Sequence, residues 1–206
     1  MTQHLNRRTL LASGLALAAG PTLAQADIGL VRVALKTSKG VITVDLNTGK
    51  APITAGNFLR YVELRKFDGI HFYRASPSIG APEFGIIQAG LRGDPAKVLK
   101  PIPHESTAKT GLSHKDGTIS MARRAPGTAD ADFFICVGDQ PSFDADPAAK
   151  GDNHGFAAFG QVVDGMDVVR VILASPTSPT AGAGAMKGQM LSPQIPILTA
   201  RRVKTA

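Results

Sequence analysis

The chain has 206 residues, of which 43% are hydrophobic and 19% are charged, together with 22 glycines and 14 prolines. This composition can supply a buried core, which excludes a globally disordered chain, and its many glycines and prolines favour short elements over long helices. The formal net charge of +7 is spread along the chain and aromatic residues make up only 5%. A nucleic-acid surface needs a basic stripe with stacking aromatic side chains, so no nucleic-acid partner is expected.

The first residues of the chain have the features of an export signal. Arg7 and Arg8 give a positive start, residues 10–20 form a short apolar run, and Ala24-Gln25-Ala26 has the small-x-small form of a cleavage site. The two arginines resemble a twin-arginine motif, and an ordinary secretory signal with two adjacent arginines is the alternative. The segment therefore predicts export, to the periplasm.

These features divide the chain into a signal peptide, residues 1–26, and one domain, residues 27–206. A chain of this length suits a single domain. No uninterrupted apolar run reaches the roughly 18 residues that a membrane span requires, so we expect no stable membrane insertion after signal cleavage. Nothing in the sequence demands assembly, and we expect a monomer.

The domain begins with a predicted hairpin followed by a helix. Residues 31–37 alternate apolar and polar side chains, and residues 41–46 form a second run of the same kind after a short turn. Pro52 suits the first turn of a helix, and the apolar side chains that follow at helical spacing predict an amphipathic helix over residues 52–64.

The rest of the domain consists mainly of short apolar runs of strand length. These predicted strands cover residues 70–74, 84–88, 118–122, 133–137 and 157–163. A second helix is expected over residues 164–173, a loop over 175–192 and a last strand over 195–203, where Pro196 requires an edge or terminal position. Many strands with two helices favour a mainly β fold, a closed or nearly closed antiparallel barrel capped by helices.

Several kinds of chemistry are missing from the sequence. There is no Gly-x-Ser-x-Gly elbow and no phosphate-binding loop of the Walker type. The histidines beyond the signal have no partner at i, i+4 and no neighbouring cysteine, so we expect no metal site. Cys136 lies in an apolar strand and is interpreted as a buried, inert thiol. The sequence predicts neither a metal nor a cofactor.

Three collinear segments carry a family resemblance. They are Phe72-Tyr73-Arg74, Ile86-Ile87-Gln88-Ala89-Gly90, and Ser120-Met121-Ala122 followed by Phe133-Phe134-Ile135. In this order and spacing the chain resembles the cyclophilin family of peptidyl-prolyl cis-trans isomerases over about residues 31–173. The resemblance implies an eight-stranded antiparallel barrel capped by two helices, with an active site on its outer surface. It also implies proline-containing polypeptides as substrates and no cofactor.

The resemblance also assigns roles to individual residues. Arg74 matches the family's catalytic arginine, and Gln88 matches the glutamine that bonds the substrate backbone and braces that arginine. Phe134 matches the floor of the proline pocket. The remaining substrate-binding positions implied by the resemblance are Ile86, Ala122, Arg123, Asp132, Phe143 and Phe156.

The reaction explains why such a site needs few groups. Rotation about an X-Pro bond takes tens to hundreds of seconds unaided, because twisting breaks the amide resonance. In the twisted state the imide nitrogen regains a lone pair, so a donor aimed at the nitrogen or the carbonyl stabilises the transition state more than the planar ground state. A guanidinium, which stays charged, suits this role.

The site also departs from the family pattern. Asp132 stands where the family has a second glutamine, and its carboxylate could pair with Arg74 or Arg123 and partly neutralise the donor. Phe156 keeps the ring of the usual His or Tyr but lacks its polar tip.

A further departure lies between the first two motifs. Residues 75–83 look like an inserted loop, and Gly85 replaces a pocket aromatic unless Phe84 or that loop supplies one. Together the departures keep an alternative open. On the same fold, the chain could be a weakly active or inactive module that binds proline-containing peptides, as a chaperone does.

Overall fold

The computed structural model describes Met1 and residues 29–203, so the predicted signal peptide lies, apart from Met1, outside the described residues. The strands are β1 (Leu30–Thr37), β2 (Gly40–Asn47), β3 (His71–Ser78), β4 (Ala81–Gly90), β5 (Thr118–Met121), β6 (Phe133–Val137), β7 (Ala157–Asp164), β8 (Thr177–Ser178) and β9 (Met190–Arg202). The helices are α1 (Pro52–Glu63), α2 (Thr107–Thr110) and α3 (Met166–Leu173), with 3₁₀ turns η1 (Pro141–Phe143) and η2 (Gly184–Met186).

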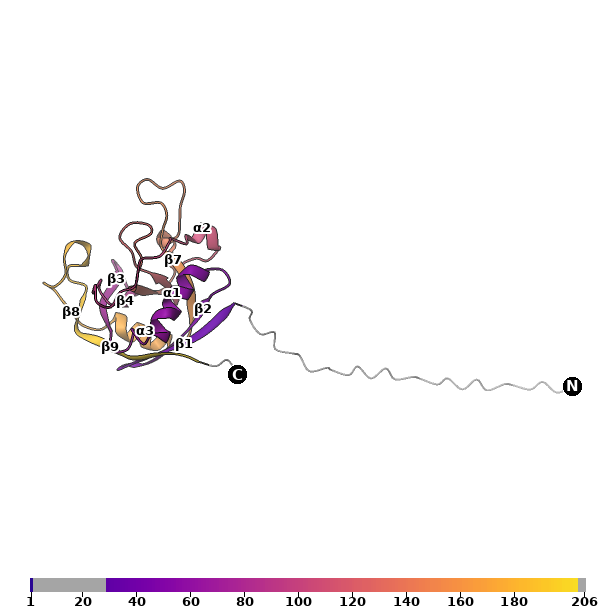
Figure 1. Ribbon diagram of the computed structural model, residues 1–206, viewed down its shortest axis with the longest axis horizontal. Coiled ribbons are helices and arrows are strands. Elements are labelled where there is room, and N and C mark those ends of the chain that lie inside the picture. Colours follow the sequence, from indigo (N-terminus) through magenta and orange to yellow (C-terminus); the bar gives the residue numbers. More distant parts are fainter. Residues whose placement is uncertain (2–28, 204–206) are drawn as a thin grey trace.

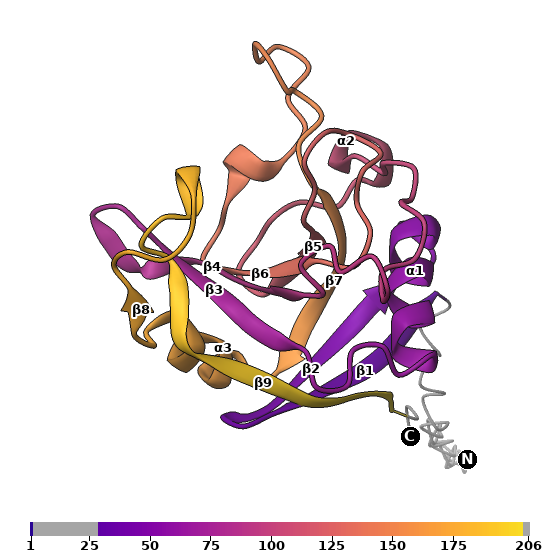
Figure 2. The same cartoon turned by 60° about the vertical axis from the view of Figure 1, so that its left-hand side comes forward.

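Eight of the strands close into an antiparallel barrel (Figures 1 and 2). The order in the sheet is β1-β2-β7-β5-β6-β4-β3-β9-β8, and the additional pairing of β1 with β9 closes the ring. The two-residue strand β8 pairs only with the start of β9 and lies outside the ring. The predicted fold, a mainly β closed barrel of eight strands with helical caps, is confirmed.

Alternation along the strands directs one set of side chains into the barrel. Phe133 and Ile135 of β6 are fully buried in the main core, as are Leu35 of β1 and Ile87 of β4. Because successive residues of a strand point to opposite faces, their neighbours face outward. Helix α1 packs against β2, β7 and β9, and α3 against β2, β3, β4 and β6. The helices thus cover apolar side chains of these strands that the barrel alone would leave exposed to water.

The structure corrects two predicted loops. Residues 75–83 are the outer end of the β3–β4 hairpin, where Ser78 pairs with Ala81. The predicted loop 175–192 contains β8 and η2, and β9 already begins at Met190. Both segments are held by backbone pairing and carry few large apolar side chains, so the apolar alternation that reveals a half-buried strand is missing.

The expected edge or terminal position of Pro196 is also wrong, because β9 is an inner strand and Pro196 lies near its middle. Strand β9 lies between β3 and β1, and Pro196 is opposite His71 of β3, whereas the next residue, Ile197, is opposite Thr37 of β1. Proline is tolerated there because the strand changes partners at this point, so its missing N–H interrupts neither ladder in the middle.

Within the described part of the chain, no helix is long and apolar enough to cross a membrane.

Candidate functional site

The outward side chains of four neighbouring strands form a row across the barrel. Arg74 of β3 is opposite Gln88 of β4, Gln88 is opposite Phe134 of β6, and Phe134 is opposite Ser120 of β5. Residues in register on adjacent strands have neighbouring side chains when these lie on the same face. The sheet therefore brings together motifs that are up to 60 residues apart in the chain.

A β-bulge adjusts the start of this row. The register of β3 and β4 shifts between Phe72 and Arg74, so that Tyr73 is an extra residue on the β3 side. A bulge bends its strand and redirects side chains. As a result, both Tyr73 and Arg74 lie within hydrogen-bonding distance of Gln88.

A cavity of about 420 Å³ lies beside the row, and a larger one of about 670 Å³ lies over it. All nine predicted site residues line the larger cavity. They are Arg74, Ile86, Gln88, Ala122, Arg123, Asp132, Phe134, Phe143 and Phe156. Resemblance-based prediction therefore selected residues from six separate segments that the fold gathers around one space.

The apolar part of this cavity is a cluster separate from the main core. Phe134 lies at its centre and meets Phe143 and Phe156 edge to face, with ring centroids 5.5 and 5.3 Å apart. Ile86 and Cys136 complete the cluster beneath the rings. Edge-to-face packing fixes ring orientation and leaves a rigid apolar wall. Burial raises the pKa of the Cys136 thiol to about 12, so this thiol is inert, as expected.

The polar part of the cavity is the half-buried guanidinium of Arg74. Its Nη1 donates to Gln88 Oε1 at 2.9 Å, and its Nε donates to Gln189 Oε1 at 2.8 Å. Among the described residues, Arg74 forms no ion pair with a carboxylate and its Nη2 donates to no protein group. Burial lowers the pKa of Arg74, as expected for a cation removed from water. Two neutral oxygens thus hold the cation without cancelling its charge.

The expected pairing of Asp132 with an arginine side chain is wrong. Its Oδ2 accepts a hydrogen bond from the Tyr73 hydroxyl at 2.9 Å, and its Oδ1 accepts one from the backbone N–H of Arg92 at 2.9 Å. Neither Arg74 nor Arg123 reaches it. The carboxylate is satisfied on the far side of Tyr73, so it does not neutralise the guanidinium in the cavity.

Arg123 instead anchors the long loop between η1 and β7, which projects from the barrel (Figure 2). Its Nη1 and Nη2 donate to the carboxylate of Asp152 at 2.6 and 2.9 Å, and its Nε donates to the carbonyl of Gly155 at 3.0 Å. The guanidinium also covers the ring of Phe156, 5.1 Å from its centroid. The Arg123 guanidinium holds the pKa of Asp152 at about 2. The side chain therefore fixes one wall of the cavity.

Sequence reasoning missed the contribution of the segment between β8 and β9. Gln189 binds Arg74, and Met186 and Met190 line the cavity. This segment runs beside β3, where the backbone N–H of Ala75 donates to the carbonyl of Gln189 at 3.0 Å. Its composition of Gly, Ala, Ser and Thr predicted only a loop, and no local signal connects it with a site more than 100 residues earlier.

Neither Phe84 nor the β3–β4 hairpin supplies the pocket aromatic that Gly85 replaces. The ring of Phe84 lies against Gly138 and is 45% exposed, outside the cavity lining. The β3–β4 hairpin tip does not line the cavity either. Apolar surface at this end comes instead from Met186 and Met190, whose unbranched side chains adapt to irregular spaces.

A buried histidine, also missed, supports the pocket from behind. His114 stacks against Phe134 with ring centroids 5.9 Å apart and an interplanar angle of 13°. Its Nδ1 lies 2.6 Å from Asp144 Oδ1 and its Nε2 lies 2.9 Å from the Ser120 hydroxyl. Burial lowers the pKa of His114, which favours the neutral ring, so Nδ1–H donates to Asp144 and Nε2 accepts from Ser120.

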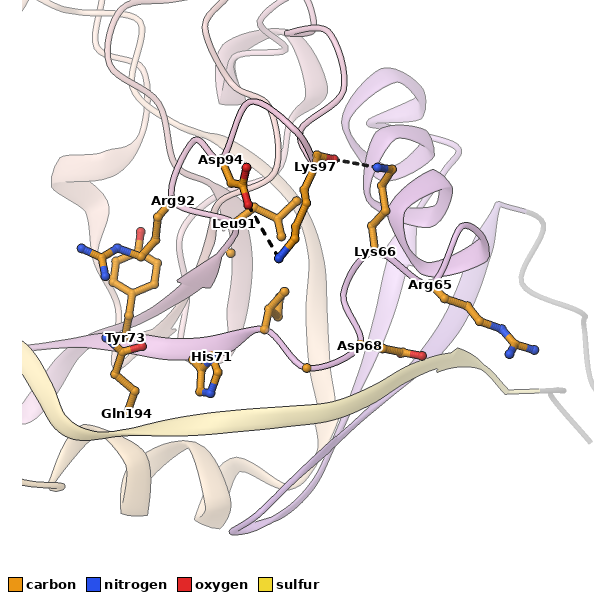
Figure 3. Close-up of a pocket in the computed structure, with 13 residues that line it drawn as sticks. Arg65, Lys66, Asp68, His71, Tyr73, Leu91, Arg92, Asp94, Lys97 and Gln194 are labelled. Carbon is orange, nitrogen blue, oxygen red and sulfur yellow. Dashed lines mark hydrogen bonds and ion pairs between the residues drawn. The ribbon is translucent and has the colours of Figure 1, made fainter.

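Figure 3 shows the residues that line the smaller cavity, which adjoins the larger one. Tyr73 and Arg92 line both, and the Arg92 guanidinium lies 5.3 Å from the centroid of the Tyr73 ring. Elsewhere the smaller cavity has lysines engaged locally, such as Lys97 with Asp94 at 3.6 Å. It contains none of the nine predicted residues, all of which line the larger cavity.

The described residues include no group of three His, Cys, Asp or Glu side chains arranged to hold a metal ion. Fold and site together define a closed β-barrel whose outer face holds an aromatic pocket next to a partly buried guanidinium.

Comparison with known proteins identifies the family to which the chain belongs. A family model described as cyclophilin type peptidyl-prolyl cis-trans isomerase/CLD matches residues 32–200. The peptidyl-prolyl cis-trans isomerase of Acinetobacter baylyi is 36% identical over 147 residues, which cover 71% of this chain and 73% of that protein. Peptidyl-prolyl cis-trans isomerase B of Escherichia coli is 34% identical over 138 residues, which cover 66% of this chain and 80% of that protein. The chain belongs to the cyclophilin-type peptidyl-prolyl cis-trans isomerase family.

Solved structures agree at the level of the fold. A cyclophilin type peptidyl-prolyl cis-trans isomerase of Cryptosporidium parvum has a TM-score of 0.67 at 19% identity, covering 86% of this chain and 99% of that one. A second structure of that protein, in the presence of the dipeptide Ala-Pro, has a TM-score of 0.66. The family model and the bacterial relatives make the chain a peptidyl-prolyl cis-trans isomerase.

Proposed function

We propose that this isomerase accelerates X-Pro rotation in exported polypeptides, and that Arg74 stabilises the twisted imide. One observation carries the proposal: the Arg74 guanidinium is held by two neutral amide oxygens beside an aromatic pocket, with Nη2 donating to none of the described protein groups. The cation is therefore oriented, only partly hydrated and available to a ligand.

The roles of the other residues follow from this geometry. The proline ring lies against Phe134, Phe143 and Phe156, whose edge-to-face packing gives a rigid apolar wall. With the ring held, the chain on the other side of the bond rotates. As the imide nitrogen becomes pyramidal, it accepts a hydrogen bond from Arg74, which is stronger in the twisted state than in the planar one. Gln88 holds the guanidinium, and the hydrogen bond to the substrate backbone that the family resemblance implies for Gln88 belongs to the same proposal.

An isomerisation assay on the purified protein with a short X-Pro peptide tests this role. Arg74→Ala should lower kcat/KM about 100- to 1,000-fold, the usual cost of losing one preorganised donor. Arg74→Lys keeps the charge but not the planar fork, so its loss should be nearly as large.

The matched control is Arg170→Ala, which removes an exposed arginine on α3 that pairs with Asp116 away from the cavity. It should leave kcat/KM unchanged. Full activity of a folded Arg74→Ala protein would overturn the arginine mechanism. An inactive, folded wild-type protein that still binds proline-containing peptides would establish the alternative, a binding module.

We propose further that the protein is exported to the periplasm and acts there as a monomer, free of membrane and nucleic acid. The twin-arginine-like start, the apolar run and the Ala24-Gln25-Ala26 site support export. Cell fractionation of a Gram-negative host should find the processed protein in the periplasm. Arg7→Lys with Arg8→Lys should retain it in the cytoplasm if the twin-arginine route is used, and size-exclusion chromatography with light scattering should give a monomer mass.

A further inference from the structure

Four side chains that line the larger cavity form a continuous hydrogen-bonded line from Arg74 to Asp132. Arg74 Nη1 donates to Gln88 Oε1 at 2.9 Å, Gln88 Nε2 donates to the Tyr73 hydroxyl at 2.6 Å, and that hydroxyl donates to Asp132 Oδ2 at 2.9 Å. Gln88 and Tyr73 are only 8% and 4% exposed. Water therefore has little access to the middle of the line, and each contact depends on the next.

The two ends of this line have fixed polarity. A guanidinium only donates hydrogen bonds, and an ionised carboxylate only accepts them. The Tyr73 hydroxyl has one proton, and giving it to Asp132 leaves the oxygen able only to accept from Gln88. The planar amide of Gln88 must then turn its NH₂ toward Tyr73 and its oxygen toward Arg74. The guanidinium at one end and the carboxylate at the other thus favour the same one of two amide orientations that have nearly the same shape.

We propose that Asp132 is a positioning residue for the isomerase site, acting through Tyr73 to keep an acceptor on Gln88, and not a donor, facing Arg74. The proposal rests on the role of Arg74 given above. Asp132 touches neither Arg74 nor the aromatic pocket, so its effect is transmitted by hydrogen-bond direction alone.

The backbone is built to hold Asp132 at this point. Its second oxygen accepts a hydrogen bond from the backbone N–H of Arg92, and a backbone N–H can only donate. A Cβ at Gly90, where φ is +147°, would overlap the Asp132 side chain, so only glycine allows this close approach. Together with the bulge at Tyr73, these features leave the carboxylate one position and one pair of donors.

Asp132→Asn should reverse the polarity of the line. The backbone N–H of Arg92 continues to donate to the amide oxygen of the new side chain. The NH₂ group of that side chain then faces the Tyr73 hydroxyl. That hydroxyl then accepts from Asn and donates to Gln88, whose amide turns and presents NH₂ to Arg74. Because the Gln88 NH₂ and the Arg74 guanidinium are both donors, Gln88 no longer holds the guanidinium. We expect kcat/KM to fall about tenfold, as for a buried polar group left unpaired.

Tyr73→Phe provides the decisive second substitution, because it removes the hydroxyl that transmits polarity and keeps the ring. Alone it should lower kcat/KM by about threefold, since Gln88 loses a brace but Arg74 can still select its orientation. Combined with Asp132→Asn it should restore activity, bringing the double variant above Asp132→Asn alone. A residue that merely supports the fold would give a double variant worse than either single one.

Thermal unfolding of each variant checks that the fold is kept, and Asp130→Asn serves as the comparison. That substitution removes the same charge two residues away without touching the line, and its loss should be smaller than that of Asp132→Asn. Wild-type kcat/KM in Asp132→Asn, or a double variant no better than it, would overturn the proposal. Full activity in Arg74→Ala would instead overturn the arginine role itself, so the two failures are distinguishable.

If Asp132→Asn does not fold, the pH profile of kcat/KM still tests the proposal. Protonation turns the carboxylate into a donor and should lower wild-type activity as the pH falls. Burial raises the pKa of Asp132, which moves this loss to higher pH. The charged group that acts on Asp132 is Asp130 on its own segment, and the guanidinium groups of Arg74 on β3 and Arg92 after β4 act on the Tyr73 hydroxyl beside it. In Tyr73→Phe the fall of kcat/KM at low pH should be smaller than in wild type. The same fall in both proteins would contradict the proposal.

Discussion

Strands β4 and β6 present two different surfaces, one inside the barrel and one outside. Inside, Ile87 and Phe133 are fully buried among other apolar side chains. Outside, their immediate neighbours Gln88 and Phe134 meet a guanidinium and a small aromatic cluster. The inner face depends on volume and shape, whereas the outer face depends on the direction of a few hydrogen bonds. Substitutions at adjacent positions should therefore separate stability from activity.

The largest effect is expected on the inner face, at Phe133. Its ring contacts Phe58, Phe67 and Phe72, with centroids 5.2, 5.6 and 6.2 Å away. Phe133→Ala should lower the free energy of unfolding by about 3–5 kcal/mol, measured by urea denaturation, because it removes apolar contact and leaves a cavity. Phe133→Leu should cost much less. A loss of kcat/KM in molecules that remain folded would break the comparison.

The neighbouring outer residue should show the opposite balance. Phe134→Ala removes the floor of the pocket, and kcat/KM should fall about 10- to 100-fold, corresponding to the roughly 1.5–3 kcal/mol of a buried aromatic contact. Its free energy of unfolding should fall less than that of Phe133→Ala, because one side of the ring borders the cavity. Equal losses of stability with unchanged activity would remove Phe134 from the site.

A smaller loss is expected at Gln189, the acceptor supplied by the C-terminal segment. Gln189→Ala leaves the Arg74 Nε without its partner at 2.8 Å, so kcat/KM should fall about tenfold while the melting temperature changes little. Lys187→Ala, an exposed change in the same segment outside the cavity lining, is the matched control and should have wild-type activity. If both variants behave alike, Gln189 does not hold the guanidinium.

The smallest effect is a pH dependence of stability at His114, behind the pocket floor. Burial lowers the folded-state pKa of His114 below the unfolded value of about 6.5, so folding disfavours the proton. Its stability contribution is complete above about pH 6.5 and is lost as the pH falls from there through the lower folded-state pKa. His114→Gln should therefore lose less free energy of unfolding than wild type between pH 7.5 and 5, in roughly the range set by these pKa values. Equal losses of the free energy of unfolding in His114→Gln and wild type would contradict this pH dependence.

Local sequence patterns predicted a mainly β barrel, and the resemblance to the cyclophilin family supplied the residues of the cavity. The alternation around Phe133 and the short motifs at Arg74, Gln88 and Phe134 are read within a few residues, and register across β3, β4 and β6 then places them in one row. The other six predicted residues also line the cavity, and all of them except Ile86 lie outside these three strands. Their catalytic roles stay predictions until the variants are measured.

Only the tertiary structure decided what orients those residues. Gln189 reaches Arg74 across 115 positions of the chain because Arg74 lies opposite Met190 in the β3–β9 pairing, and no local pattern encodes that register. Asp132 faces Tyr73 and the Arg92 N–H because the chain turns beside it at the end of β4. Residue type determined which groups can donate or accept. The packing of distant backbone segments decided which partners they meet, because hydrogen bonds need both atoms within about 3 Å and correctly aligned.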